Sequence, residues 1–153
     1  MISLAFLLTI FSTSSFAQSS KEIGGKTVYC RNATILVDHQ LPNLGISDTE
    51  GNIILNPDLL NEQPLVVRWF VFYHECGHTH VGASELLADC WAINRGHSEG
   101  WLAEKDLSAI CGSWQGAPAT RTHPSALRRC QNINRCFQKL KVKNASSTSV
   151  NKQ

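Results

Sequence analysis

The sequence predicts a single α+β domain, in which a small antiparallel sheet packs against two neighbouring helices and disulfide bonds hold the parts together. Short β-rich runs occur before residue 56, and long apolar stretches of helical character follow Pro64. All six cysteines lie beyond residue 17. A chain of 153 residues suits one domain, because most domains contain about 100–200 residues. We expect the domain to cover residues 18–143, between a leader at 1–17 and a disordered polar tail at 144–153.

The leader has the features of a secretory signal peptide. Ile2–Phe11 is a short apolar run without charged side chains, and Ser15 and Ala17 place small residues where signal peptidase reads them. The alternative is an uncleaved membrane anchor, but a membrane span needs about 20 apolar residues. We therefore expect cleavage before Gln18, a secreted or periplasmic protein, and no stable membrane anchor after cleavage.

The first half of the expected domain favours short strands. Lys26–Asp38 contains Thr, Val, Tyr and Ile in a strand-like mixture, and it predicts one strand, or two with a break near Asn32. Residues 41–52 are rich in turn-forming residues. The apolar run Ile53–Leu55 that follows predicts another strand, next to the candidate site.

A long helix is expected to begin at Pro64, because proline suits a first helical turn. The following stretch is apolar nearly all round, as in a buried helix, and it ends in the motif HECGH at His74–His78. Its β-branched and aromatic content would also suit a strand. The spacing of the two histidines decides for a helix, because residues four apart share one helical face.

Three further helical segments are expected. Gly77 and Gly82 are expected to loosen the chain after the motif, and Ser84 is a candidate N-cap for a second helix that stops around Gly96. A short helix is expected over residues 101–110, and one or two more over residues 125–141.

The cysteines predict a disulfide framework. An even number of cysteines in an exported chain is typical of disulfides, and six cysteines permit 15 pairings, which stay open here. A cysteine metal site is the alternative, but no C-x-x-C pair occurs. We expect three disulfides among Cys30, Cys76, Cys90, Cys111, Cys130 and Cys136.

The motif HECGH has the spacing of a catalytic metal site. His74 and His78 would present two imidazoles on one helical face, and imidazole suits zinc. Glu75 lies one residue further round the helix, where its carboxylate could accept a proton from a zinc-activated water without binding the metal. Zinc lowers the pKa of a bound water toward about 7. The spacing therefore predicts a Zn²⁺ site with Glu75 as general base.

A catalytic zinc site needs a third protein ligand. Glu85 and Asp89 lie four residues apart and so share a face of the second helix, and either carboxylate could bind the metal. If Glu85 binds it, Asp89 could accept the remaining ring N–H of a ligand histidine. His80 would lie about 200° from His78 on a continuous helix, facing away. The candidates for the third zinc ligand are His80, Glu85, Asp89, His97 and His123.

These motifs carry a resemblance to a known group of enzymes. HECGH followed by ELLAD resembles the gluzincin metallopeptidases, and with THPSALRR at 122–129 it is most similar to the prenyl-protein endopeptidases and bacterial stress-induced membrane peptidases. The resemblance implies that the zinc ligands are His74, His78 and Glu85, that Glu75 is the general base, that Asp89 supports a ligand histidine, and that His123 and Arg129 support the site.

The sequence also departs from that family. The interval between His78 and Glu85 is short, and the family's transmembrane helices are missing. The motif also comes near the metzincin pattern, although Gly82 falls one residue late and Ser84 occupies the third-ligand position. We expect a miniature gluzincin-like enzyme.

Three functions are compatible with such a sequence. The first is an exported zinc metallopeptidase that hydrolyses peptide bonds in a peptide or protein substrate. The alternatives are an exported zinc-binding protein without hydrolytic activity and a disulfide-rich binding module without metal. A net charge of only +2 argues against nucleic acid as a partner. His123, restricted to extended backbone by Pro124, is expected on a loop over the site as a catalytic donor. The alternative for His123 is an exposed loop histidine.

Overall fold

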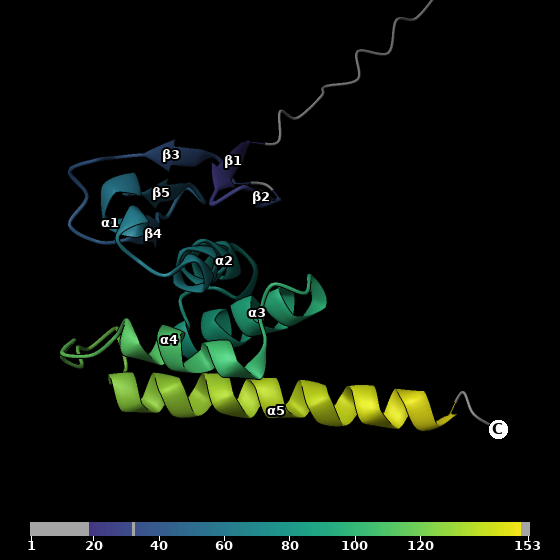
Figure 1. The fold of residues 1–153 in the computed structure, drawn as a ribbon. Helices are drawn as coiled ribbons and strands as arrows, with labels where there is room; N and C mark the ends of the chain where they lie inside the picture. Colours follow the sequence, from purple (N-terminus) through teal and green to yellow (C-terminus); the bar gives the residue numbers. More distant parts are fainter. Residues whose placement is uncertain (1–18, 32, 151–153) are drawn as a thin grey trace, which may run out of the picture.

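The computed structural model describes residues 19–31 and 33–150, with the side chains of 144–150 excepted. It confirms an α+β fold: small sheets and the short helix Pro57–Asn61 form a layer on one side of a central helix, and the helices that follow the central helix lie on the other side (Figure 1). The expected leader at 1–17 lies outside the described residues. No helix in the described ranges is long and apolar enough to cross a membrane.

The strands form two sheets, where one antiparallel sheet was expected. Strands β1 (Ser20–Ile23) and β2 (Lys26–Tyr29) make an antiparallel hairpin. The second sheet has the order β3-β5-β4, from β3 (Ile35–Val37), β4 (Gly45–Ser47) and β5 (Ile53–Leu55). Its β4–β5 pair is antiparallel, but β3 runs parallel to β5. The turn-rich segment before β5 returns the chain as β4, which leaves β3 to pair with the other edge of β5.

The hairpin between β1 and β2 turns on two glycines. Gly24 and Gly25 have φ angles of +55° and +79°, which a two-residue hairpin turn requires and which glycine adopts without steric cost. The expected break in the strand region is confirmed, since β2 ends at Tyr29 and β3 begins at Ile35.

Helix α2 (Leu65–Val81) is the centre of the fold. Pro64, expected in the first helical turn, is the N-cap residue just before it. Strands β4 and β5 contact α2 on one side, while α3 and α4 contact it on the other. This double coverage explains why the helix is apolar nearly all round. The most deeply buried core side chains come from both layers: Val28, Ile53, Leu55, Val67, Phe70, Phe72, Ile93, Ile110 and Ile133.

The other helices are α1 (Pro57–Asn61), α3 (Glu85–Ser98), the 3-10 helix η1 (Glu104–Asp106), α4 (Leu107–Gly112) and α5 (Ala126–Val150). Ser84 caps α3 by accepting a hydrogen bond from the Leu87 N–H. The last helix is longer than expected, because the backbone of residues 144–150 continues as helix where a disordered tail was expected.

One disulfide ties the strand layer to the central helix, and two more tie helices to one another. Cys30–Cys76 joins the end of the hairpin to α2, Cys90–Cys136 joins α3 to α5, and Cys111–Cys130 joins α4 to α5. All six cysteines are paired, as the even count predicted. Each helix that follows α2, apart from η1, is therefore covalently linked to another helix of the domain.

Candidate metal centre

Helices α2 and α3 come close together because residue 77 has no side chain. A Cβ atom added to Gly77 would lie 3.1 Å from the backbone oxygen of Ala88. The expectation that Gly77 loosens the chain is wrong, since α2 continues through it to Val81 and ends at Gly82, whose φ is +75°. Glycine at position 77 instead permits close packing, and the short turn at 82–84 brings Glu85 back toward the motif.

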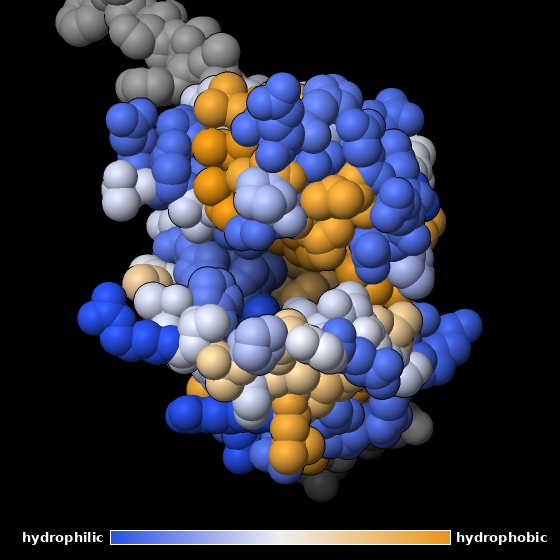
Figure 2. All heavy atoms as spheres, turned by 90° about the vertical axis from the view of Figure 1, so that its left-hand side faces the viewer, coloured by the Kyte–Doolittle hydropathy of each residue, from blue (hydrophilic) through white to orange (hydrophobic). Residues whose placement is uncertain are grey.

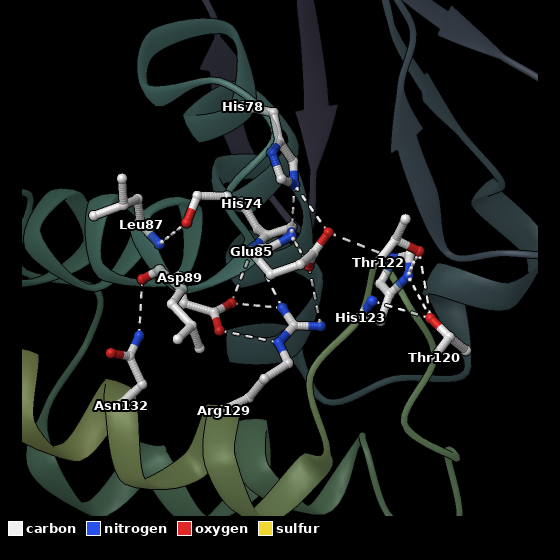
Figure 3. A network of polar contacts seen from close by, with 12 residues as sticks. His74, His78, Glu85, Leu87, Asp89, Thr120, Thr122, His123, Arg129 and Asn132 are labelled. Atoms are coloured by element: carbon white, nitrogen blue, oxygen red, sulfur yellow. Dashed lines mark hydrogen bonds and ion pairs between the residues drawn. The ribbon is translucent and has the colours of Figure 1, made fainter.

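The side chains of His74, His78 and Glu85 converge (Figure 3). The two histidine Nε2 atoms lie 3.1 Å apart. Glu85 Oε2 lies 3.2 Å from His74 Nε2, and Glu85 Oε1 lies 3.5 Å from His78 Nε2. Zinc bonds of about 2.0–2.1 Å to nitrogen and oxygen place tetrahedral ligand atoms roughly 3.3–3.4 Å apart. The three side chains thus have the spacing of three ligands around one ion.

Each imidazole makes a contact through its Nδ1 atom, and its Nε2 atom is left directed at the point where the three side chains converge. His78 Nδ1 lies 2.9 Å from the Gly82 carbonyl oxygen, to which it donates a hydrogen bond. His74 Nδ1 lies 2.9 Å from Asp89 Oδ1. An oxygen acceptor at Nδ1 favours the tautomer in which Nε2 carries the free electron pair. Both rings are therefore oriented for metal binding through Nε2.

Asp89 is fully buried and carries two partners. Arg129 from α5 donates from Nε to Oδ2 at 3.0 Å and from Nη2 to Oδ1 at 2.5 Å, a bidentate pair. The same guanidinium lies 3.6 Å from Glu85 Oε2 and 4.2 Å from the centre of the Trp114 ring. The structure therefore places Asp89 behind His74 and gives its charge a permanent counterion.

Buried histidines and carboxylates of opposite charge shift one another's pKa values at this site. Burial alone would lower the pKa of His74, but the carboxylates of Asp89 and Glu85 outweigh it and raise the pKa to about 9. The pKa of His78 is raised chiefly by Glu85. Burial raises the pKa of Glu85, yet the neighbouring histidines dominate and hold it well below its usual value. A cation is thus favoured at the point where these groups meet.

Glu75 lies beside the edge strand of the three-stranded sheet. Its side chain is buried, and a Cβ atom on Gly45 in β4 would lie 3.4 Å from Glu75 Cγ. Its charge contributes to raising the pKa values of both His74 and His78. Glu75 is therefore near the two imidazoles without belonging to the converging set.

His123 reaches the group from the loop between α4 and α5. Its Nε2 atom lies 3.5 Å from Glu85 Oε1, while 58% of its side chain is exposed. The loop is held by Thr120, whose hydroxyl oxygen accepts from the His123 N–H at 3.0 Å and whose own N–H donates to the His123 carbonyl at 2.9 Å. His123 thus lies at the rim, between the buried ligands and solvent.

The remaining candidate ligands lie elsewhere. His80 is exposed near the end of α2, and its Nδ1 contacts the Cys76 carbonyl oxygen at 3.0 Å. It groups with Cys30 and Cys76, but those two sulfur atoms form a disulfide and so offer no thiolate. His97 contacts the Phe137 ring instead. Among the alternatives to Glu85, only Asp89 and His123 are near the site, and the two oxygens of Asp89 are engaged by Arg129 and His74.

The residue that sequence reasoning missed is Trp114. It lies in no motif, and neither its spacing nor its neighbours mark it. Only the folded chain shows that its ring covers the Arg129 guanidinium.

Comparisons of the chain with models of known protein families, with characterised proteins and with solved structures find no match. Glu85 Oε2 is buried and has ion-pair contacts with His74 and Arg129, but no hydrogen-bond partner among the described residues. A buried acceptor of this kind is costly unless it is satisfied, and a cation between the two Nε2 atoms would satisfy it. Two imidazoles and a carboxylate are ligands that zinc accepts.

We predict that metal binding depends on His74, His78 and Glu85 but not on His80. His74→Ala, His78→Ala and Glu85→Ala should each remove most bound zinc, because each deletes one of three ligands. Asp89→Asn should weaken zinc binding by about 10–100-fold, as expected when the partner of a ligand histidine is lost.

His80→Ala is the matched control, because it removes an exposed histidine from the same helix. The measurement is zinc per chain after dialysis, by atomic emission, with the affinity from competition against a chelator. Wild-type zinc content in Glu85→Ala would move the third ligand to another residue.

Proposed function

We propose that this protein is an exported zinc-dependent metallopeptidase. The observation that carries the proposal is the convergence of the His74 and His78 Nε2 atoms with the Glu85 carboxylate, next to a buried carboxylate, Glu75, that is not part of the set. A purely structural zinc site uses four protein ligands and needs no free carboxylate beside them. Three ligands and an adjacent base are the arrangement of a hydrolytic site.

The loop between α4 and α5, which carries His123, lies on a face of the molecule that is hollowed. Figure 2 shows the face on the left of Figure 1, where the loop between α4 and α5 projects, and the surface is hollowed between the strand layer and the helix layer. Hydrophilic surface lies in the hollow and hydrophobic surface along its upper side. An extended peptide could enter here, with its side chains against the apolar part and a carbonyl group over the polar part.

Each protein group would have a defined task. Zinc, when bound, would polarise the substrate carbonyl and make a water molecule acidic. Glu75 would accept the proton from that water and deliver it to the leaving amine. His123 at the rim would donate a hydrogen bond to the carbonyl oxygen as its negative charge grows. Arg129 would hold Asp89 against His74, so that the imidazole keeps its tautomer and orientation.

Export is proposed on two grounds. Three disulfides are typical of proteins that fold in oxidising compartments. The leader at 1–17 has the composition of a signal peptide. A secreted or periplasmic location fits both.

A specific observation favours a second candidate, an exported zinc-binding protein without hydrolytic activity. Two surface pockets in the described part of the chain are lined by other residues: one by Trp91, Asn94 and Leu140 among others, the other by Ile23, Val37 and Leu60 among others. Neither is lined by His74, His78 or Glu85, the three side chains that converge. A protein that only holds zinc needs no substrate pocket at the metal.

We predict that Glu75→Gln keeps zinc and abolishes hydrolysis. The substitution removes the base but no ligand, so the zinc content should stay at the wild-type level. Cleavage of a diverse peptide library, followed by mass spectrometry, measures the activity. Glu50→Gln, at an exposed position on the turn between β4 and β5, is the matched control and should cleave normally. Full activity in Glu75→Gln would refute this mechanism. Zinc binding without cleavage by the wild-type protein would favour the second candidate.

We predict separately that His123 contributes to kcat and not to zinc binding. His123→Ala should lower kcat by about 10²–10³-fold, the usual effect of losing one donor to a developing oxyanion. Zinc content and Tm should stay near those of the wild type, because the side chain is largely exposed. His39→Ala, at another exposed histidine, is the control. Loss of zinc from His123→Ala would make His123 a ligand, and unchanged kcat would leave it without a catalytic role.

A further inference from the structure

We propose that Trp114 is a positioning residue of the metal centre, which acts by holding the Arg129 guanidinium against Asp89. The inference rests on the zinc site proposed above, and it adds a residue that no motif identifies. It concerns metal affinity, so it does not require that the site be hydrolytic.

Arg129 lies within reach of two carboxylates, so charge alone does not fix the orientation of its guanidinium. The guanidinium contacts Asp89 in a bidentate manner and lies 3.6 Å from Glu85 Oε2. A rotation toward Glu85 would draw that carboxylate away from the metal point and would leave Asp89 incompletely paired. A residue that fixes the plane of the guanidinium thus decides which carboxylate is left for the metal.

The Trp114 ring provides this restraint. The Cζ atom of Arg129 lies 4.2 Å from the ring centre, within the range of a cation–π interaction, which is stronger where water is excluded. The Arg129 side chain is only 11% exposed. Trp114 is itself held edge-on by the buried ring of Phe70, at 5.7 Å between ring centres. Phe70 lies one helical turn before His74, so the restraint is anchored to the ligand-bearing helix.

The Cys111–Cys130 disulfide brings the two partners together. Arg129 directly precedes Cys130, and Trp114 follows Cys111 by one helical turn. The segment closed by this disulfide carries Trp114, His123 and Arg129, all of which approach α2 and α3 from outside. The disulfide limits how far Arg129 can move relative to the Trp114 ring, and the ring limits how the Arg129 guanidinium can rotate.

The test compares variants at position 114 in the full exported chain. Trp114→Leu removes the ring face but keeps an apolar side chain against Phe70, and it should weaken zinc binding about 10-fold, as for other losses behind a ligand histidine. Trp114→Phe keeps a ring face and should stay within about threefold of wild type. Trp91→Leu, at another half-buried tryptophan whose ring lies against Tyr73 and His80, is the matched control and should bind zinc normally.

A double-mutant cycle separates positioning from general destabilisation. In an Arg129→Met background, Trp114→Leu should cause no further loss of zinc affinity, because its effect passes through Arg129. Equal losses in both backgrounds would overturn the inference, as would normal zinc binding by Trp114→Leu. Should Trp114→Leu not fold, Trp114→Met takes its place in the cycle.

A second measurement needs no metal. In the metal-free wild-type protein, the ring current of Trp114 should shift the Arg129 Nε–H proton resonance upfield, and Trp114→Leu should abolish the shift. An unshifted resonance in the wild type would overturn the inference whatever the protein does with zinc. Zinc binding without peptide cleavage would instead refute the proposed peptidase and leave the role of Trp114 intact.

Discussion

The close approach of α2 to α3 at Gly77 is the constraint on which the site depends. A side chain at position 77 would meet the backbone of Ala88 at 3.1 Å, and neither helix could yield without moving the candidate ligands that it carries. On α2, His74 and His78 lie before and after Gly77 in the sequence. On α3, Glu85 and Asp89 lie before and after Ala88. Separation of the helices by even part of an ångström would open the distances of 3.1–3.5 Å between the candidate ligand atoms.

A second constraint is the burial of charge between these helices. Asp89 is fully buried, and His74, Glu75 and Glu85 are nearly so. Buried charges are tolerated only when they are paired, and removing one partner of a buried pair typically costs about 3–5 kcal/mol. Arg129 supplies the pairing from α5, which two disulfides fix to α3 and α4. The disulfide framework therefore supports the site as well as the small core.

The local parts of this arrangement could be predicted from the sequence, and the long-range parts could not. The i, i+4 spacings of His74 with His78 and of Glu85 with Asp89 report helical faces directly, and Ser84 marks the start of α3. The parallel pairing of β3 with β5, the disulfide connectivity and the contact of Trp114 with Arg129 depend on segments far apart in sequence, for which no local pattern exists. Gly77 was misread as a loosening element because a helical glycine looks the same whether it permits a bend or a close contact. The length of α5 was also missed, because its polar end lacks the apolar periodicity by which helices are recognised.

The central claim is that one zinc ion binds between α2 and α3 through two histidines and a carboxylate. X-ray absorption at the zinc edge of the zinc-loaded wild-type protein tests it most directly, because the spectrum reports the ligand atoms themselves. The account predicts nitrogen and oxygen neighbours at about 2.0–2.1 Å, with the multiple-scattering pattern of two imidazoles. Sulfur neighbours at about 2.3 Å would place the metal on cysteines and contradict the account, and so would a spectrum with a single imidazole.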